Sequence, residues 1–173
     1  MHWKFDAWDS DFAALNTDTT GVELETSVTF MSPRSMEFDK VNGDANTIFG
    51  AVTRTWTVEP ASLYRLHDFG VLDRIGMVIN VSSVTNIAYA FLRLGTSASH
   101  LLEWRFADTG LATTGWNVES ANFADNYITG NGWNLGSGLL YMCVGVAFDG
   151  ETNALADIRI DHLFGVFNTP TIS

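Results

Sequence analysis

The sequence predicts an all-β fold, an antiparallel β-sandwich of the jelly-roll type. About nine or ten short segments are rich in β-branched and aromatic residues, and several alternate apolar with polar side chains. Turn-forming Gly, Asn, Asp and Ser separate these segments. Between them we find no amphipathic helix of the kind that parallel α/β architectures require. Many short strands joined by turns are typical of a double-sheet jelly roll.

The composition is that of one globular domain. The chain has 173 residues, of which 46% are hydrophobic and 17% are charged. A chain of this length and hydrophobicity can bury a core of its own. We expect residues 1–20 to form an N-terminal arm or a first edge strand, and residues 21–173 to form a single jelly-roll domain.

Four strands are predicted in the first half of the domain. A turn at Asn42 and Gly43 separates the second strand from the third. Gly50 lies inside the third strand, where an isolated glycine indicates a bulge. The predicted strands are residues 23–30, 35–38, 48–58 and 74–81, with a turn or one short helical turn at residues 60–68.

An inner hairpin is predicted around the sequence FLRLGTSASHLLEWRF. Two alternating segments, residues 88–94 and 101–106, flank a polar six-residue connection that begins at Gly95. In the second segment, Glu103 and Arg105 alternate with apolar residues and therefore face away from the core. The side chains expected to line the core are Leu92, Leu94, Leu102, Trp104 and Phe106. The remaining predicted strands are residues 115–118, 139–148 and 156–167.

The charge balance excludes some classes of partner. With 20 acidic and 9 basic residues the net charge is −11, which repels nucleic-acid phosphates and anionic membranes. The N-terminal sequence MHWKFDAWDSDF lacks the basic start and apolar centre of a signal peptide. We therefore expect no nucleic-acid or membrane partner, and synthesis in a host cytoplasm without Sec-type export. The one cysteine, Cys143, lies in an apolar strand and is expected to be a buried thiol.

No catalytic motif is found in the sequence. There is no GxSxG, HExxH or P-loop pattern, and the four histidines are far apart. A glycosidase would need a pair of catalytic carboxylates. Glu103 is the acid to consider for such a site, since it lies on the polar face of its strand. Solvent exposure explains that position equally well. The sequence therefore predicts a protein that is not an enzyme and needs no cofactor.

Acidic residues near the two ends of the chain raise the possibility of a calcium site. Asp161 lies just inside the last predicted strand, and it could join Asp6, Asp9 or Asp11 in an all-oxygen site. The alternative is that Asp161 caps a nearby turn or pairs with an arginine. The sequence contains no DxDxDG ligand run, and no metal site is predicted.

A loop rich in Asn and Gly offers a candidate binding site. Trp133 lies in the sequence DNYITGNGWNLGSG, where little core is available to bury it. Sugars stack their apolar faces on such rings, so the candidate contacts for a sugar or a protein partner are Tyr127, Asn131 and Trp133. The alternative is that Trp133 packs beneath its own loop.

Four aromatic residues precede the first regular strand: Trp3, Phe5, Trp8 and Phe12. A free arm would leave them in water, whereas interface cores are enriched in aromatic residues. One interpretation is therefore an arm that contacts a partner. The other, equally weighted, is that this segment folds back onto the sandwich as its first strand.

Several short motifs between Ser32 and Phe167 resemble a known family. They are MEFDK followed by NG, then INVSSVTNIAYAFLRLGTSASHLLEWRF, TTGWN, LYMCVGVAF and ADIRIDHLFGV. Together they resemble the jelly-roll domains of carbohydrate-binding modules, in the version found in phage virion proteins such as capsid decorations and tail fibres.

This resemblance implies a non-enzymatic structural component of a phage-like virion, a decoration protein on the outer surface of the capsid. Its partners would be the major capsid protein or another virion protein, with further copies of itself and a glycan as additional candidates. The alternative is a carbohydrate-binding module or a receptor-binding tail-fibre domain.

Overall fold

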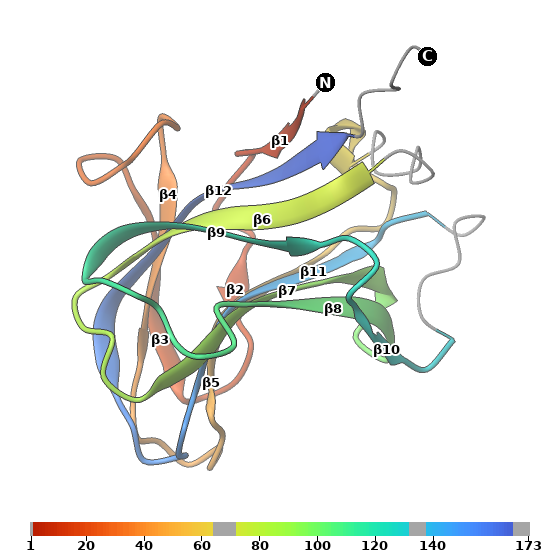
Figure 1. Cartoon of the computed structure of the whole chain (residues 1–173). Coiled ribbons are helices and arrows are strands. Elements are labelled where there is room, and N and C mark those ends of the chain that lie inside the picture. The colour runs from red at the N-terminus through yellow and green to blue at the C-terminus, as the bar shows by residue number, and fades with distance from the viewer. Residues whose placement is uncertain (1, 64–71, 132–137, 168–173) are drawn as a thin grey trace.

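The protein is a sandwich of two antiparallel β-sheets, which confirms the predicted fold class (Figure 1). The structure is a computed structural model that describes residues 2–63, 72–131 and 138–167. The first sheet has the strand order β3-β4-β12-β6-β9, with β1 also paired to β12, and the second has the order β10-β8-β7-β11-β5-β2. The first sheet contains β1 (His2–Phe5), β3 (Thr19–Glu25), β4 (Ser35–Lys40), β6 (Leu72–Val81), β9 (Gly115–Asn122) and β12 (Leu155–Phe167). The second contains β2 (Ala13–Ala14), β5 (Phe49–Thr55), β7 (Ile87–Ser97), β8 (His100–Phe106), β10 (Tyr127–Thr129) and β11 (Tyr141–Phe148).

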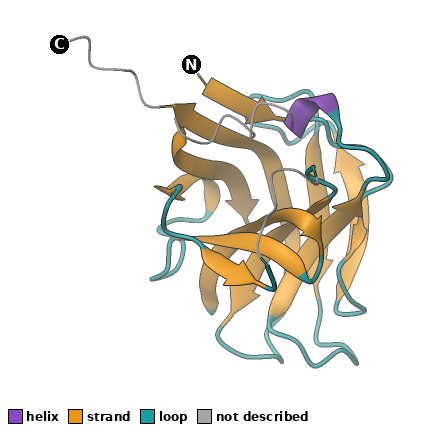
Figure 2. Ribbon diagram, turned by 90° about the vertical axis from the view of Figure 1, so that its right-hand side faces the viewer, coloured by secondary structure: helices purple, strands orange, loops and turns teal. Residues whose placement is uncertain are grey.

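The chain crosses repeatedly from one sheet to the other, as in a jelly roll. It passes from β4 to β5, back to β6, and over again to the β7–β8 hairpin. Figure 2 shows the two layers joined by loops, with one short helical turn at residues 61–63. No helix in the described ranges is long and apolar enough to span a bilayer.

The core lies between the two sheets and includes the predicted hairpin residues. Leu92, Leu94, Trp104 and Phe106 are fully buried in one cluster, and Leu102 packs against it half-buried. The alternation of β8 therefore predicted the correct core-facing side. All eight residues of β11 are buried, as expected for a central strand.

The hairpin connection is shorter than predicted. β7 extends to Ser97 and β8 begins at His100, so two residues connect the strands where six were expected. Gly95 lies within the ladder, and its pairing with Leu101 is followed by a register shift. A Cβ atom at Gly95 would lie 2.1 Å from the carbonyl oxygen of His100. Only glycine permits this close approach of the two strands. Gly95 is therefore part of the β7–β8 ladder and not, as predicted, the first residue of the connecting loop.

The predicted bulge at Gly50 is wrong. β5 pairs with β11 in unbroken register from Phe49 to Thr55. A Cβ atom at Gly50 would lie 2.7 Å from the Cβ of Lys40, which belongs to the facing sheet. The missing side chain therefore leaves room for Lys40 between the sheets.

The first predicted strand is displaced along the chain, because β3 ends at Glu25. The Glu25 carboxylate accepts hydrogen bonds from the backbone N–H and the hydroxyl of Ser27. These local bonds compete with the sheet ladder and turn the chain away from β4. Residues 26–34 are therefore a loop and not a continuation of the strand.

The N-terminal segment is part of the sandwich. β1 pairs antiparallel with β12, with Trp3 opposite Gly165. The indole N–H of Trp8 donates to the carbonyl oxygen of Asp161 at 2.7 Å. Of the two interpretations of this segment, the structure agrees with the one in which it folds back onto the sandwich as a strand, because its aromatic side chains are enclosed in the core and are not displayed on a free arm. The four buried aromatics, each at most 4% exposed, are Trp3, Phe5, Trp8 and Phe12.

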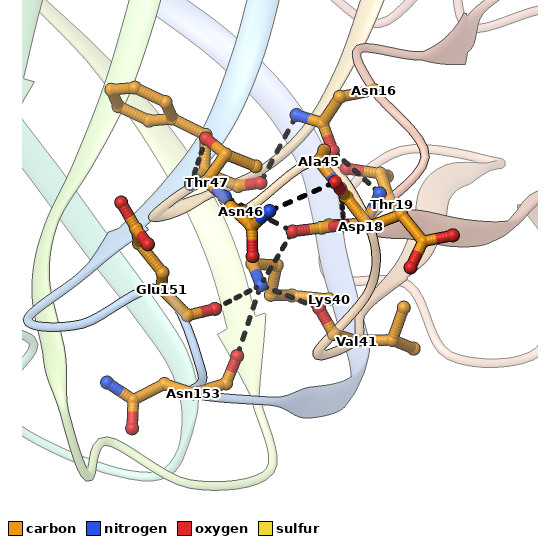
Figure 3. Close-up of polar contacts among 12 residues, drawn as sticks. Asn16, Asp18, Thr19, Lys40, Val41, Ala45, Asn46, Thr47, Glu151 and Asn153 are labelled. Atoms are coloured by element: carbon orange, nitrogen blue, oxygen red, sulfur yellow. Dashed lines mark hydrogen bonds and ion pairs between the residues drawn. The ribbon is translucent and has the colours of Figure 1, made fainter.

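A buried ion pair lies at one end of the sandwich (Figure 3). The Nζ atom of Lys40 lies 3.6 Å from a carboxylate oxygen of Asp18, and neither side chain is exposed. Lys40 also donates hydrogen bonds to three backbone carbonyl oxygens, those of Val41 at 2.6 Å, Glu151 at 3.1 Å and Asn153 at 3.3 Å. This ammonium group thus links three segments that are distant in sequence.

Candidate functional site

A polar cleft of about 590 Å³ opens between the terminal strands of the two sheets. One wall is the end of β9, the edge strand of the first sheet, and the other is formed by β8 and β10 of the second. The loop from β9 to β10 and the loop after β8 complete the lining. We call it the Tyr127 cleft; it is lined by Arg74, Arg105, Ala107, Asp108, Ser120, Ala121, Asn122, Ala124, Asp125, Asn126 and Tyr127.

An aromatic ring stacked on an arginine forms part of the cleft wall. The guanidinium carbon of Arg105 lies 4.1 Å from the ring centre of Tyr127 and 4.6 Å from that of Tyr89. Glu103 accepts a hydrogen bond from Arg105 Nε at 2.7 Å and another from Arg93 Nε at 2.6 Å. These contacts hold Arg105 in place. The Tyr127 ring, which stacks on Arg105 with one face, is therefore held in place as well. The side chain of Tyr127 remains 50% exposed.

The loop from β9 to β10 is anchored in the core. Its Phe123 ring packs 5.0 Å from the Trp104 ring, and the Trp104 indole N–H donates to the Phe123 carbonyl oxygen at 2.9 Å. The amide nitrogen of Asn126 donates to the same carbonyl oxygen at 3.1 Å. Asn122 donates through its side chain to a carboxylate oxygen of Asp125 at 2.8 Å. The loop therefore enters the cleft from a rigid base.

The predicted binding residues lie in three different situations. Tyr127 lines the cleft, as a candidate sugar contact would. Asn131 is exposed two residues beyond β10 and does not line the cleft. Trp133 lies outside the described residues.

Glu103 does not lie on an open face, which corrects the expectation from its strand pattern. The residue is only 6% exposed, and each of its carboxylate oxygens accepts a hydrogen bond from an arginine. Arg93 covers the rings of Phe49 and Phe91, so arginine side chains close this face over the carboxylate. In this position Glu103 orients Arg105, and its own oxygens are already engaged.

Asp161 holds a loop in place where a calcium site was considered. Its carboxylate oxygens accept backbone N–H bonds from Phe30, Met31 and Ser32, and one of them lies 2.7 Å from Nδ1 of His162. Positively polarised N–H groups disfavour a cation at the same oxygens. The other proposed ligands are engaged elsewhere, Asp6 with Lys4 and both Asp9 and Asp11 with Arg54. Among the described residues, no group of three acidic, His or Cys side chains is placed to hold a metal.

The hydrogen bonds of Asp161 predict acid sensitivity. Burial alone would raise its pKa, but the bonds from His162 and from the backbone N–H groups of Phe30 and Met31 outweigh burial and hold the pKa below the ordinary 3.8. A carboxyl group with a lowered native pKa stabilises the fold above the unfolded pKa of about 3.9, and this contribution is lost as pH falls through the native value.

We therefore expect Asp161→Asn to be less stable than the wild type at pH 7, with a difference that shrinks as the pH falls from about 5 towards 2. Urea midpoints measured at pH 7, 5 and 3 test this. Asp18, whose pKa is also lowered, is present in both proteins, so the difference between them reports on Asp161. A difference that stays constant between pH 7 and pH 3 would contradict the assignment.

Sequence reasoning did not identify the arginines of the cleft. Arg74 and Arg105 appear in the sequence as ordinary polar residues of alternating strands. A usable signal was present at Arg105, because it lies on the outward face of β8 with Glu103, and the same face of the neighbouring β7 carries Tyr89 and Arg93. Arg74 belongs to β6 and meets the cleft only because β6 pairs with β9.

Comparison with known proteins does not identify a family for this chain. No family model matches the sequence, and no curated protein matches it. The chain is similar to a crystal structure of the CBM22-1 and GH10 modules of endo-1,4-β-D-xylanase 10B from Clostridium thermocellum, complexed with xylohexaose, with 10% sequence identity and a TM-score of 0.48. The match covers 98% of this chain and 28% of that chain. Such distant similarity carries no information on ligand or activity, so the assigned fold rests on the observed strand pairing.

Proposed function

We propose that this protein is a non-catalytic β-sandwich that binds a carbohydrate chain in the Tyr127 cleft. The observation that carries the proposal is the half-exposed ring of Tyr127, stacked on Arg105 at a polar cleft. A sugar ring places its apolar C–H face against such a ring, and its hydroxyl groups need donors and acceptors nearby. The cleft combines both features.

The polar groups around Tyr127 are already oriented. Asn126 uses its side-chain nitrogen to bond the carbonyl oxygens of Phe123 and Ala124, which leaves its amide oxygen as an acceptor. Asp125 is fixed by its bond from Asn122. Groups held in place before binding lose little conformational entropy when a ligand arrives. This arrangement supports recognition of hydroxyl groups beside the tyrosine ring.

The proposal predicts that Tyr127→Ala lowers glycan affinity by about tenfold, the equivalent of losing one ring-stacking contact. A glycan array identifies ligands of the wild type, and calorimetric titration of wild type and variant with the best ligand measures the loss. Ile128→Ala is the matched control, because Ile128 is 69% exposed on the same strand but does not line the cleft. The proposal fails if no glycan binds, or if Tyr127→Ala binds as tightly as the wild type.

The expectation of a virion decoration protein stays a prediction. Its proposed contact, the N-terminal aromatic segment, is used inside the fold. Glycan binding in the Tyr127 cleft corresponds to the alternative drawn from the sequence, a carbohydrate-binding module or a receptor-binding tail-fibre domain.

A further inference from the structure

We infer that the carbohydrate recognised by the Tyr127 cleft carries a carboxylate, as uronic-acid-containing chains do. This inference rests on the proposed function and specifies its ligand class. Two guanidinium groups from different sheets line the cleft, Arg74 from β6 and Arg105 from β8. The chain has 9 basic residues against 20 acidic ones, so two arginines in one cleft stand out against the general charge of the protein.

Arg74 has neutral partners. Its Nε and Nη2 atoms donate to the hydroxyl of Ser120 at 3.1 and 2.8 Å, and Nη2 also donates to the Ser120 carbonyl oxygen at 3.2 Å. Its Nη1 atom donates to the side-chain oxygen of Asn122 at 3.3 Å. Within the described ranges, Arg74 forms no ion pair with a carboxylate. Its positive charge is therefore held at the cleft by neutral groups, with no carboxylate paired to it among the described residues.

Arg105 shares its carboxylate with a second arginine. Glu103 bonds the Nε atoms of both Arg93 and Arg105, so one negative charge serves two positive ones. In the described part of the chain, only Nε of the Arg105 guanidinium forms a hydrogen bond, which leaves its two Nη groups as donors. The planar group is fixed between Tyr89 and Tyr127. A fixed guanidinium with free N–H groups matches the geometry of a carboxylate.

Two acidic residues also line the cleft, and they act against an anionic ligand. Asp108 and Asp125 are both exposed, whereas Arg74 and Arg105 are half-buried. Water and salt screen exposed charges more strongly than partly buried ones. We therefore expect each arginine to contribute more to the potential inside the cleft than either aspartate does. An acidic sugar would place its carboxylate between the two arginines while its ring lies against Tyr127.

The test uses acidic oligosaccharides and the same chains with their carboxylates methyl-esterified. Suitable pairs are oligogalacturonate, oligomannuronate and glucuronoxylan oligosaccharides, each with its methyl ester, titrated calorimetrically. We expect at least one acid to bind about tenfold or more tightly than its ester, with an affinity that falls as NaCl is raised. Arg74→Gln should remove most of this preference, and because Arg74 has neutral partners, the substitution leaves no buried charge unpaired.

Further variants separate charge from geometry. Arg105→Lys keeps the charge but loses the planar fork and its stacking on Tyr127, so we expect it to weaken binding of the acid by more than it weakens binding of the ester. The double variant Asp108→Asn, Asp125→Asn should bind the acid more tightly than the wild type. A cooperative thermal unfolding transition, measured for each variant, checks that the substitution has not unfolded the protein.

The possible failures are distinguishable. If esters or neutral glycans bind as tightly as acids and still depend on Tyr127, the inference of an acidic ligand is overturned and the proposed function stands. If no acid, ester or neutral glycan binds, both are overturned. An acid preference that Arg74→Gln and Arg105→Lys leave unchanged would also overturn the inference, because it would then arise elsewhere on the surface.

Discussion

Deletion of residues 1–12 is expected to unfold the protein. The deletion removes β1 and four buried aromatic side chains from the core cluster. Truncating one buried Phe or Trp costs about 3–5 kcal/mol, whereas a whole domain has a net stability of about 5–15 kcal/mol. The rings also contact one another edge to face, Phe5 to Trp8 at 5.1 Å and Trp8 to Phe12 at 5.1 Å. Their contributions to the free energy of unfolding are therefore coupled.

Circular dichroism and thermal unfolding of the truncated chain test this expectation. The companion variant Trp8→Phe keeps a ring in place and loses the hydrogen bond to Asp161, so it should remain folded and lose only about 1–2 kcal/mol. If the truncated chain unfolds cooperatively at the wild-type temperature, the segment is an appendage and the packing described for it is wrong.

Replacing Lys40 by alanine is expected to cost about 3–5 kcal/mol, the usual penalty for removing one partner of a buried ion pair. The substitution leaves the carboxylate of Asp18 buried with only its N–H donors, Ala45 at 2.8 Å and Thr47 at 3.3 Å. It also leaves three carbonyl oxygens without the ammonium group that they share. Each unsatisfied buried group adds to the loss.

Urea unfolding measures the effect, and Lys4→Ala is its matched control. Lys4 forms an ion pair with Asp6 at 3.0 Å, but both side chains are about 40% exposed, so that variant should lose no more than about 1 kcal/mol. Equal midpoints for the two variants would show that the Lys40 ammonium reaches solvent and that its enclosure is not as described.

The strand alternation could be read from the sequence because it is a local property. Trp104 was correctly placed in the core, since each residue of a strand faces the opposite side from its neighbours. The same rule misjudged Glu103, because its burial depends on arginines from two strands that cover it. Lys40 likewise gives no local sign of burial, which requires Gly50 on the facing sheet and carbonyl groups from a distant loop.

Of the residues that line the Tyr127 cleft, the sequence predicted only Tyr127 as a binding residue. Tyr127 lies in a polar, glycine-rich region, and its exposure follows from the lack of local apolar neighbours. The arginines belong to β6 and β8, and pairing between distant strands brings them to the same cleft. For the N-terminal aromatic residues the sequence left two interpretations, a free arm or a first strand. The local sequence does not show whether β12 has an unpaired edge with which β1 can pair.

The central position of β12 in the first sheet has a consequence for how the chain acquires its structure. β12 pairs with β1 and β4 along one side and with β6 along the other, and the bond from Trp8 to Asp161 spans 153 positions. On the ribosome, these earlier strands have no central partner until β12 emerges, and contacts at such separation make folding slow. Until then the aromatic side chains near the N-terminus remain available for wrong associations, so yield from cells should depend on synthesis rate, temperature and chaperone supply more than on final stability.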